Sequence, residues 1–330
     1  MRIKESNNIT YVIKLLNNYK FNMSEHYCYN MNLIEKVSEG PYKVINMLKG
    51  SGRLSFFIVF EDETPIIIAP LFKNKHELFV VGGSVGWDYT DLFYLRDSSY
   101  EKKLDCMNYL LNYLKKKGFR VLRWDFLPSD SLSFKLLEEF KNKPIAEIKN
   151  VGIKFDDYNS YLCALSKSVR QNLRTAENRI IRENKTYELL NNINQPLPKK
   201  IVKECIDLYC TRQKNKYKKN LLSLLMIKTI NFQTQMMVKQ KGIFFVLQID
   251  GKVASFMFGY HCENSLEIPK LAIDDTFKFY SPGMVLVNKT IEYLANETQI
   301  RYLDLCRGTE SYKFKMGGQE YYTYNYFIEL

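Results

Sequence analysis

The sequence predicts an α/β fold built from two lobes of one design, with mixed sheets flanked by helices and a helical segment connecting the lobes. Its 330 residues suit two compact domains better than one. Hydrophobic residues make up 46% of the chain, which is enough to bury a sizeable core. One order of elements also occurs twice: three strands, a glycine-containing loop, a helix and a closing strand. We therefore predict a first lobe at 1–150 and, at 151–330, a basic helical segment followed by the second lobe.

The first copy of this order begins with alternating and continuous apolar runs separated by turn residues. Ser98 followed by Glu101 has the pattern of a capping box at the start of a helix, and Gly118 suits its end. The predicted elements are strands over Leu54–Phe60, Pro65–Pro70 and Leu78–Gly82, a helix over Ser98–Lys117 and a strand over Arg120–Leu127.

The second copy repeats the order. Asp250-Gly251 is a strong hairpin signal between its first two strands. The predicted elements are strands over Phe244–Ile249, Lys252–Tyr260 and Leu266–Ile273, a helix over Met284–Glu297 and a strand over Ile300–Cys306. The last segment, Tyr321–Ile328, alternates like a strand, and residues 321–330 can return to pair with the first lobe.

Two helices are predicted between the lobes, over Leu162–Lys185 and Leu197–Tyr217. In the first of these, apolar residues recur on one face and basic residues on the opposite face. Residues 151–219 hold 15 Lys and Arg against 7 Asp and Glu, a net of +8 out of +12 for the whole chain. This concentration of charge favours a local anionic partner.

Other features of the composition exclude several classes of protein. The seven cysteines are dispersed, without a C-x-x-C pair, and there are only three histidines, so we expect neither a disulfide framework nor a metal site. No apolar run reaches the roughly 18 to 20 residues that a membrane span needs. The N-terminus opens no apolar stretch of the signal-peptide kind, and we expect a cytoplasmic protein.

The second lobe carries the candidate site. Ser281, Pro282 and Gly283 precede the helix that starts at Met284, so free backbone N–H groups at the positive end of that helix suit a phosphate or pyrophosphate. Polar side chains follow the next strand, at the edge of the sheet where ligands of open α/β sheets bind. They are Asp304, Arg307, Glu310, Tyr312 and Lys313, with Gly308 among them.

At these residues the chain resembles the Acetyltransf_6 group of the GNAT superfamily, the CelD-type acetyltransferase domain associated with polysaccharide biosynthesis. It is also similar to the Fem-type aminoacyltransferases, which pair two GNAT lobes. Three motifs carry the resemblance: Leu165–Arg174, Tyr280–Gly283 and Asp304-x-x-Arg307-Gly308-x-x-x-Tyr312-Lys313. The glycine-rich pyrophosphate loop usual in GNAT enzymes is replaced by Ser281-Pro282-Gly283, which has a single glycine.

The resemblance implies two tandem GNAT-like lobes and transfer of an acyl group from acyl-CoA, foremost acetyl-CoA, to a primary amine such as that of an amino sugar or cell-envelope precursor. It implies no metal. Donor binding falls to Ser281, Pro282, Gly283, Met284, Arg307, Gly308, Arg170 and Arg174. Among the catalytic residues, Asp304 is expected to take the amine proton, Tyr312 to protonate the thiolate and Lys313 to stabilise the oxyanion.

Acceptor binding is assigned to Asp88, Tyr89 and Asp91 of the first lobe and to Glu310. Several alternatives stay open: an acyl carrier protein or an aminoacyl-tRNA as donor, an O-acyl acceptor, and a binding module without catalysis. The basic helix lacks interleaved aromatic residues, which argues against a nucleic-acid-binding module.

Overall fold

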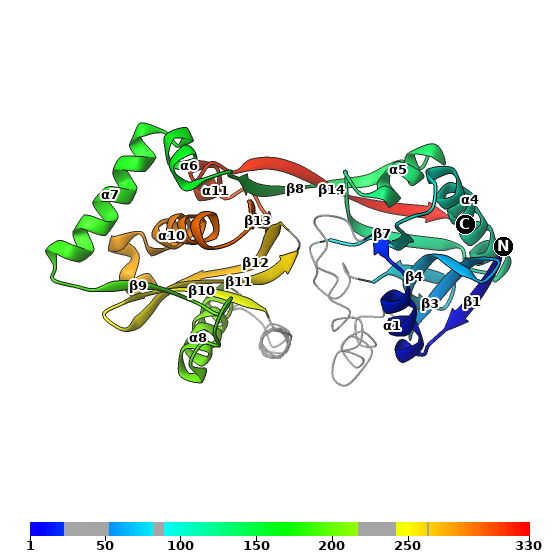
Figure 1. Ribbon diagram of the computed structural model, residues 1–330, viewed down its shortest axis with the longest axis horizontal. Coiled ribbons are helices and arrows are strands. Elements are labelled where there is room, and N and C mark those ends of the chain that lie inside the picture. Colours follow the sequence, from blue (N-terminus) through cyan, green and yellow to red (C-terminus); the bar gives the residue numbers. More distant parts are fainter. Residues whose placement is uncertain (23–52, 82–88, 217–241, 263) are drawn as a thin grey trace. The chain divides into compact units, whose positions relative to one another are not determined.

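The computed structural model describes residues 1–22, 53–81, 89–216, 242–262 and 264–330, shown in Figure 1. The chain divides into two compact units. Unit 1 consists of Met1–Lys149 and Tyr321–Leu330, and unit 2 of Asn150–Glu320. Both units combine a mixed sheet with helices, so the predicted α/β class is confirmed. Among the helices of the described ranges, none has both the length and the apolar character needed to cross a membrane.

Unit 1 is built on a sheet with the strand order β1-β3-β4-β5-β7-β14, and β6 pairs with both β4 and β2. The β5–β7 pair is parallel and the other pairs are antiparallel. The elements are β1 (Arg2–Ser6), α1 (Ile9–Asn18), β2 (Phe21–Asn22), β3 (Arg53–Glu61), β4 (Thr64–Asn74), β5 (Glu77–Val80), β6 (Phe93–Leu95), α4 (Tyr100–Lys116), β7 (Val121–Pro128), α5 (Leu132–Glu139) and β14 (Gln319–Glu329).

The core of unit 1 forms between this sheet and the apolar faces of α4 and α5. Met107 and Leu110 of α4, Trp124 of β7 and Tyr326 of β14 lie in one buried cluster. Helix α4 begins one residue later than the capping-box pattern indicates, because the Ser99 side chain accepts the capping hydrogen bond. Strand β14 is thus part of the unit 1 core although it comes after unit 2 in the sequence.

Unit 2 has a sheet with the strand order β8-β13-β12-β11-β10-β9, in which only β12 and β13 run parallel. The elements are β8 (Pro144–Lys154, of which Asn150–Lys154 belong to the unit), α6 (Tyr158–Ala164), α7 (Lys167–Arg182), β9 (Tyr187–Asn191), α8 (Lys199–Lys216), β10 (Ile243–Ile249), β11 (Lys252–Cys262), β12 (Ser265–Ile273), η2 (Asp275–Tyr280), α10 (Pro282–Glu297), β13 (Tyr302–Arg307) and α11 (Ser311–Lys315).

Helices cover both faces of this sheet. Helix α10 packs on β10, β11 and α7, whereas α8 packs on β11 and β12 from the other face (Figure 1). Near the N-terminus of α10, three consecutive residues are fully buried: Val285, Leu286 and Val287. Because this helix is apolar around most of its circumference at that end, its N-terminus is fixed firmly against the sheet.

The single helix predicted over Leu162–Lys185 is wrong. The structure has two helices, α6 and α7, separated at Leu165 and Ser166. Leu165 is extended, and the Ser166 side chain caps α7 by accepting a hydrogen bond from the Val169 N–H. The apolar spacing continues across the break, so periodicity alone cannot detect it.

Candidate functional site

A cavity of unit 2 forms where strands β12 and β13 separate. The two strands pair only over Ser265–Glu267 and Tyr302–Asp304. Strand β12 continues to Ile273 and β13 to Arg307, so their carboxyl-terminal halves no longer bond to each other. A parallel pair that separates in this way leaves room for a ligand at the carboxyl edge of the sheet.

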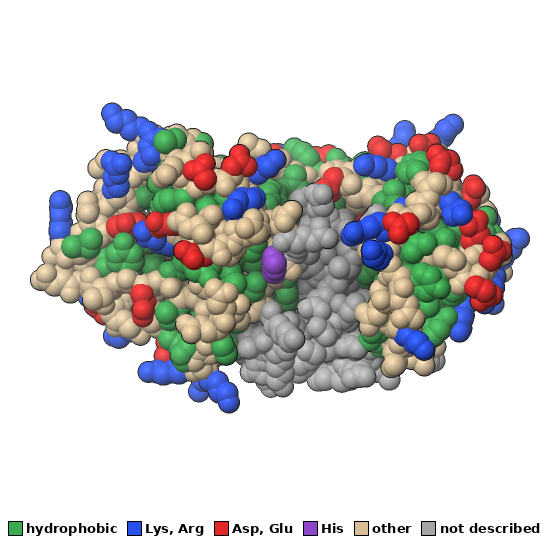
Figure 2. All heavy atoms as spheres, viewed as in Figure 1, with side chains coloured by type: hydrophobic (Ala, Val, Ile, Leu, Met, Phe, Trp, Pro, Cys, Tyr) green, Lys and Arg blue, Asp and Glu red, His purple; other side chains and the backbone are tan. Residues whose placement is uncertain are grey.

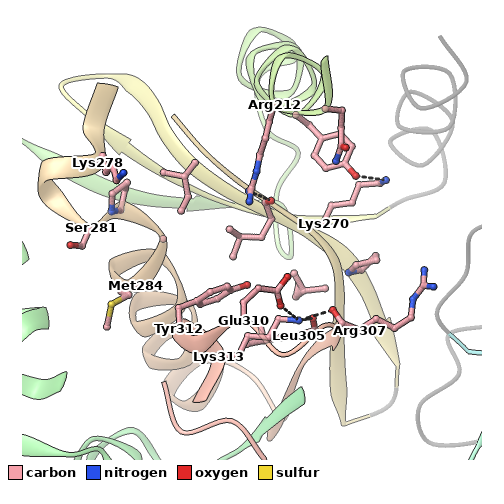
Figure 3. A pocket seen from close by; sticks show the side chains of 18 residues that line it. Arg212, Lys270, Lys278, Ser281, Met284, Leu305, Arg307, Glu310, Tyr312 and Lys313 are labelled. Carbon is pink, nitrogen blue, oxygen red and sulfur yellow. Dashed lines mark hydrogen bonds and ion pairs between the residues drawn. The ribbon is translucent and has the colours of Figure 1, made fainter. Parts of the chain in front are cut away.

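The cavity between these strands has a volume of about 790 Å³. Four parts of unit 2 surround it: the end of α8, the second half of β12, the η2–α10 junction, and the segment from β13 into α11 (Figure 3). Lys278 and Ser281 lie at one end, and Glu310, Lys313 and Arg307 lie toward the other, with Met284 and Tyr312 between them (Figure 3).

The N-terminus of α10 forms one end of the cavity wall. Ser281 has a left-handed backbone (φ 49°, ψ 48°), and Pro282 occupies the first helical position. No side chain caps the helix. Gly283 is buried here, and a Cβ at this position would lie 2.6 Å from the Ile273 side chain. A larger residue at 283 would therefore crowd the helix tip that the cavity exposes.

Positive charge dominates the cavity lining. Its basic residues are Arg212, Lys270, Lys278, Arg307 and Lys313. The Arg212 guanidinium donates to the Leu271 carbonyl at 2.8 Å, and the Lys270 ammonium lies 4.5 Å from the centre of the Tyr209 ring. Among the described residues of the lining, Glu310 is the one acid. Such a surface favours an anionic ligand.

Tyr312 and Glu310 supply groups that can exchange protons. Burial, together with the nearby Glu310 charge, raises the pKa of the Tyr312 phenol, so this side chain stays protonated at neutral pH. Partial burial also raises the pKa of the Glu310 carboxyl, but hydrogen bonds from its own N–H and from Lys313, and the charges of Lys313 and Arg212, outweigh that effect and lower its pKa overall. Glu310 is therefore ionised at neutral pH.

Lys313 is buried and holds the loop that leads from β13 into α11. Its ammonium donates to the carbonyl oxygens of four successive residues, at 2.9 Å (Leu305), 3.2 Å (Cys306), 2.8 Å (Arg307) and 3.1 Å (Gly308). It also lies 3.0 Å from a Glu310 carboxylate oxygen. Gly308 has φ +101°, and a Cβ there would lie 2.7 Å from that carboxylate oxygen. The ammonium thus positions both the loop and Glu310.

Asp304 lies outside the cavity lining. Its side chain is fully buried, and one carboxylate oxygen accepts a hydrogen bond of 2.7 Å from the Cys306 N–H. Cys306 has a left-handed backbone (φ 54°) at a register shift between β13 and β8. The carboxylate thus binds a backbone N–H at the register shift of its own strand.

The structure brings together eight of the residues selected from the sequence. Ser281, Pro282, Gly283, Met284, Arg307, Glu310, Tyr312 and Lys313 all line the cavity. Arg170 and Arg174 do not line it. The Arg170 guanidinium donates to the carbonyls of Leu162, Cys163 and Leu165 at the end of α6, and Arg174 is exposed on α7.

The residues selected in the first lobe belong to unit 1. Asp88 lies outside the described residues. The Tyr89 side chain is buried and stacks on Tyr321 with 6.4 Å between the ring centres. Asp91 is buried and accepts hydrogen bonds from the Leu92 N–H and the Ser133 hydroxyl. Burial raises the pKa of Asp91 to about 7.

Sequence reasoning missed the contributions of α8, β12 and η2 to the cavity. These are Tyr209, Arg212, Gln213, Ile268, Pro269, Lys270, Leu271, Ile273 and Lys278. The basic residues near the end of α8 were the available signal, but only the packing of α8 across β12 brings Arg212 to the site.

A family model matches this region. Residues 234–314 fit the Acetyltransf_6 model, described as an acetyltransferase (GNAT) domain. Unit 2 thus contains a region that matches a GNAT domain. This assignment makes the chain an enzyme of the N-acyltransferase type and confirms the resemblance at the level of the GNAT group. No curated protein sequence matches the chain.

Solved structures share the fold of the whole chain. The C-terminal domain of a putative lysylphosphatidylglycerol synthetase from Agrobacterium fabrum has a TM-score of 0.59 at 11% identity, covering 97% of this chain and 92% of that chain. FemX has a TM-score of 0.51 at 9% identity, covering 100% and 98%. A tandem GNAT protein from the clavulanic acid biosynthesis pathway has a TM-score of 0.50 at 10% identity, covering 99% and 98%. The predicted fold of two GNAT-like lobes is thereby confirmed.

Within the described part of the chain, no group of three or more His, Cys, Asp or Glu side chains is placed to hold a metal ion.

Proposed function

We propose that the GNAT domain transfers an acyl group from a CoA thioester, foremost acetyl-CoA, to a primary amine. The observation that carries this proposal is the arrangement of the cavity. An uncapped helix N-terminus and Lys278 lie at one end, and Tyr312 and Glu310 lie beyond Met284 (Figure 3). A thioester donor needs this separation, because its phosphates and its reacting carbonyl are far apart in the molecule.

The donor's pyrophosphate binds at the start of α10. The first-turn N–H groups of a helix have no carbonyl partner within the helix, and the helix dipole favours an anion there. Lys278 lies on the same side of the cavity and adds a positive charge (Figure 3). The pantetheine arm then follows the cavity between β12 and α10 toward Tyr312.

The reaction is a direct attack of the neutral amine on the thioester carbonyl. A C–N bond forms and the C–S bond breaks. The attacking nitrogen loses a proton to Glu310, and the departing thiolate takes the proton of the Tyr312 hydroxyl. The edge of β12 beyond Glu267 does not pair with β13. A backbone N–H of this stretch, other than at Pro269, which has none, would stabilise the developing oxyanion. This route differs from the sequence-based expectation because Asp304 is buried outside the cavity and the Lys313 ammonium is held by loop carbonyls.

We propose an amino sugar or a cell-envelope or polysaccharide precursor as the acceptor. The resemblance of the sequence motifs to CelD-type acetyltransferases supports this class of substrate. A hydroxyl acceptor would form a C–O bond in place of the C–N bond while the same C–S bond breaks, and the proton would leave the oxygen.

A thermal-shift measurement with CoA tests donor binding. We expect CoA to raise the melting temperature of the wild type, by mass action on the folded state. Gly283→Trp should abolish the increase, because the new side chain fills the helix tip. Asn296→Trp, on the exposed last turn of the same helix, serves as the matched control and should keep it. A wild type that does not respond to CoA or acetyl-CoA would refute the proposed donor.

Aminoacyl-tRNA is the second candidate donor. The whole-chain fold similarity to FemX and the resemblance to Fem-type enzymes favour it. The exposed face of α7 also carries basic residues, including Lys167, Arg174 and Arg182. Figure 2 shows Lys and Arg side chains in blue over this helix. If tRNA is the donor, its affinity should fall steeply with salt, and Arg174→Ala combined with Arg182→Ala should weaken it. CoA affinity should be unaffected by that double substitution.

A further inference from the structure

One aromatic side chain near the cavity is exposed yet held in place. Phe279 of η2 is 56% exposed. The Arg179 guanidinium carbon lies 4.7 Å from the centre of its ring, and the same guanidinium donates to the Phe279 carbonyl at 3.0 Å. The Tyr280 ring meets it nearly edge-on, at 5.4 Å and 73°. Arg179 and Tyr280 therefore fix the ring while much of its surface stays open to solvent.

The backbone that carries this ring lies next to the cavity, although the Phe279 side chain is not among those that line it. Phe279 comes directly after Lys278 and two residues before Ser281, and both of these line the cavity. They lie at the end away from Glu310 (Figure 3). Phe279 is thus adjacent to the cavity at the end where the donor's phosphates are proposed to bind.

Two basic side chains near the ring can bind a phosphate-bearing ligand. Lys278 is exposed, and Arg179 lies against the ring. Three acids are also close: Glu183 accepts a hydrogen bond from the Tyr280 hydroxyl, the Asp274 side chain caps η2, and Asp275 is exposed at the start of η2. A planar aromatic surface supported by a guanidinium and flanked by an ammonium suits a nucleobase with a phosphate beside it.

We propose that Phe279, supported by Arg179, stacks on the adenine of CoA and that Lys278 binds the 3′-phosphate of the same adenosine. This inference rests on the proposed function, since it extends the donor from the pyrophosphate at α10 outward to its nucleoside. The order of groups agrees with the order of residues: thioester at Tyr312, pyrophosphate at Gly283, adenosine 3′-phosphate at Lys278 and Phe279. The site thereby selects CoA over donors that lack an adenosine.

Calorimetric dissociation constants for three probes test the assignment: CoA, dephospho-CoA without the 3′-phosphate, and 4′-phosphopantetheine without the adenosine. Stacking on an aromatic side chain contributes about 1–3 kcal/mol per base. Phe279→Ala should therefore weaken the binding of CoA and dephospho-CoA by about fivefold or more and leave that of phosphopantetheine unchanged. Lys278→Ala should reduce the preference for CoA over dephospho-CoA.

The matched control is Ile181→Ala, which removes an apolar side chain of α7 that is 58% exposed, and it should change none of these constants. Unchanged CoA affinity in Phe279→Ala would overturn the inference and leave the proposed function intact. An equal loss of phosphopantetheine affinity would also overturn it, because Phe279 would then affect binding of the part of the donor that contains no adenosine. If wild type binds none of the three probes but binds an RNA ending in CCA, the CoA assignment and the proposed donor fail together.

Discussion

Two residues with left-handed backbones mark corresponding places in the two units. Cys306 of β13 has φ 54°, and Phe126 of β7 has φ 59°. Each N–H donates to a side-chain oxygen: Cys306 to Asp304 at 2.7 Å, and Phe126 to Asn325 at 2.9 Å. Both residues follow the stretch of their strand that pairs in parallel, in β12–β13 and β5–β7. The backbone geometry is thus common to both units, whereas the side chain that stabilises it differs. This comparison gives Asp304 a structural role.

Paired substitutions distinguish this role from proton transfer. Glu310→Gln should lower kcat by about 10²-fold or more, the range for loss of a general base, without changing CoA affinity. Asp304→Asn should keep turnover close to wild type, because the amide oxygen can still accept from Cys306. Steady-state kinetics of the wild type and the two variants with the same amine acceptor measure both changes in kcat. Loss of turnover in Asp304→Asn with normal folding would instead support Asp304 as the base.

Asp91 makes the stability of unit 1 depend on pH. Burial raises the pKa of its carboxyl to about 7 in the folded state, against about 3.9 in an unfolded chain. The folded state therefore holds the proton more tightly, and the stabilisation present at acidic pH is lost as pH rises from about 4 to 7. The linkage amounts to several kcal/mol. Asp91→Asn should remove this decrease and increase the free energy of unfolding at pH 8.

Urea unfolding followed by tryptophan fluorescence can measure this change, because Trp124 is buried in the core of unit 1. Equal pH dependence in wild type and variant would contradict the assignment to Asp91.

At the scale of single residues, the sequence predicts the cavity-lining residues best where they are consecutive in the chain. Ser281–Met284 and Glu310–Lys313 are each contiguous, so their members reach the cavity together. The role of Asp304 does not follow from its sequence position. Side chains alternate between the two faces of a strand, so Asp304 faces away from Leu303 and Leu305. This pattern does not show whether the carboxylate faces a ligand or its own backbone. Arg170 raised a similar difficulty, since its partners are the carbonyls at a helix break that periodicity does not reveal.

At the scale of elements, the segment joining β13 to α11 depends on one buried ammonium. Lys313 holds the carbonyls of Leu305–Gly308 and the Glu310 carboxylate. A register shift between Asp304 and Arg307 interrupts the pairing of β13 with β8, and α11 spans only five residues. The end of the cavity that carries Tyr312 is therefore shaped by a side chain rather than by the sheet.

Lys313→Met should destabilise the protein by about 3 kcal/mol, because it leaves several carbonyl groups without their donor. Methionine keeps the length and apolar stem of the side chain, so the loss reports on the ammonium. Chemical denaturation measures the change, and Lys315→Met provides a control on the exposed side of α11. A Lys313→Met protein as stable as the control would show that the loop does not depend on these bonds.

The sequence reveals most elements but few of their contacts. The second-lobe strands and the helix after Gly283 follow from period and turn residues. The packing of α8 on β12 does not, because it depends on which faces meet after folding. The sequence alone therefore does not assign Arg212, Lys270 and Lys278 to the site, whereas the structure places them in the cavity lining.

At the scale of the whole molecule, the two units do not correspond to two continuous pieces of sequence. Unit 1 takes β14 as a sheet strand from residues that follow unit 2, and Tyr326 and Ile328 of this strand lie in the unit 1 core. The β8 residues Asn150–Lys154, which follow unit 1 in the chain, pair with β13 in unit 2.

A fragment ending at Lys149 should therefore be less stable than the same fragment supplied with a peptide of residues 319–330. The peptide restores the partner of β7 and buries two large side chains, and we expect it to raise the melting temperature by several degrees. A peptide with Tyr326→Ser and Ile328→Ser is the control. Equal melting temperatures with and without the native peptide would show that unit 1 does not need β14.

This order of segments has a consequence for synthesis. The N-terminal part of the chain leaves the ribosome first. Strand β14, which pairs with β7, is completed only after the 171 residues from Asn150 to Glu320 have been translated. At about 5–20 residues per second this delay lasts roughly 10 to 30 s. Throughout it the nascent chain presents an open β-edge, which invites pairing with other chains. Chaperone dependence and sensitivity to translation speed should accordingly concentrate in unit 1.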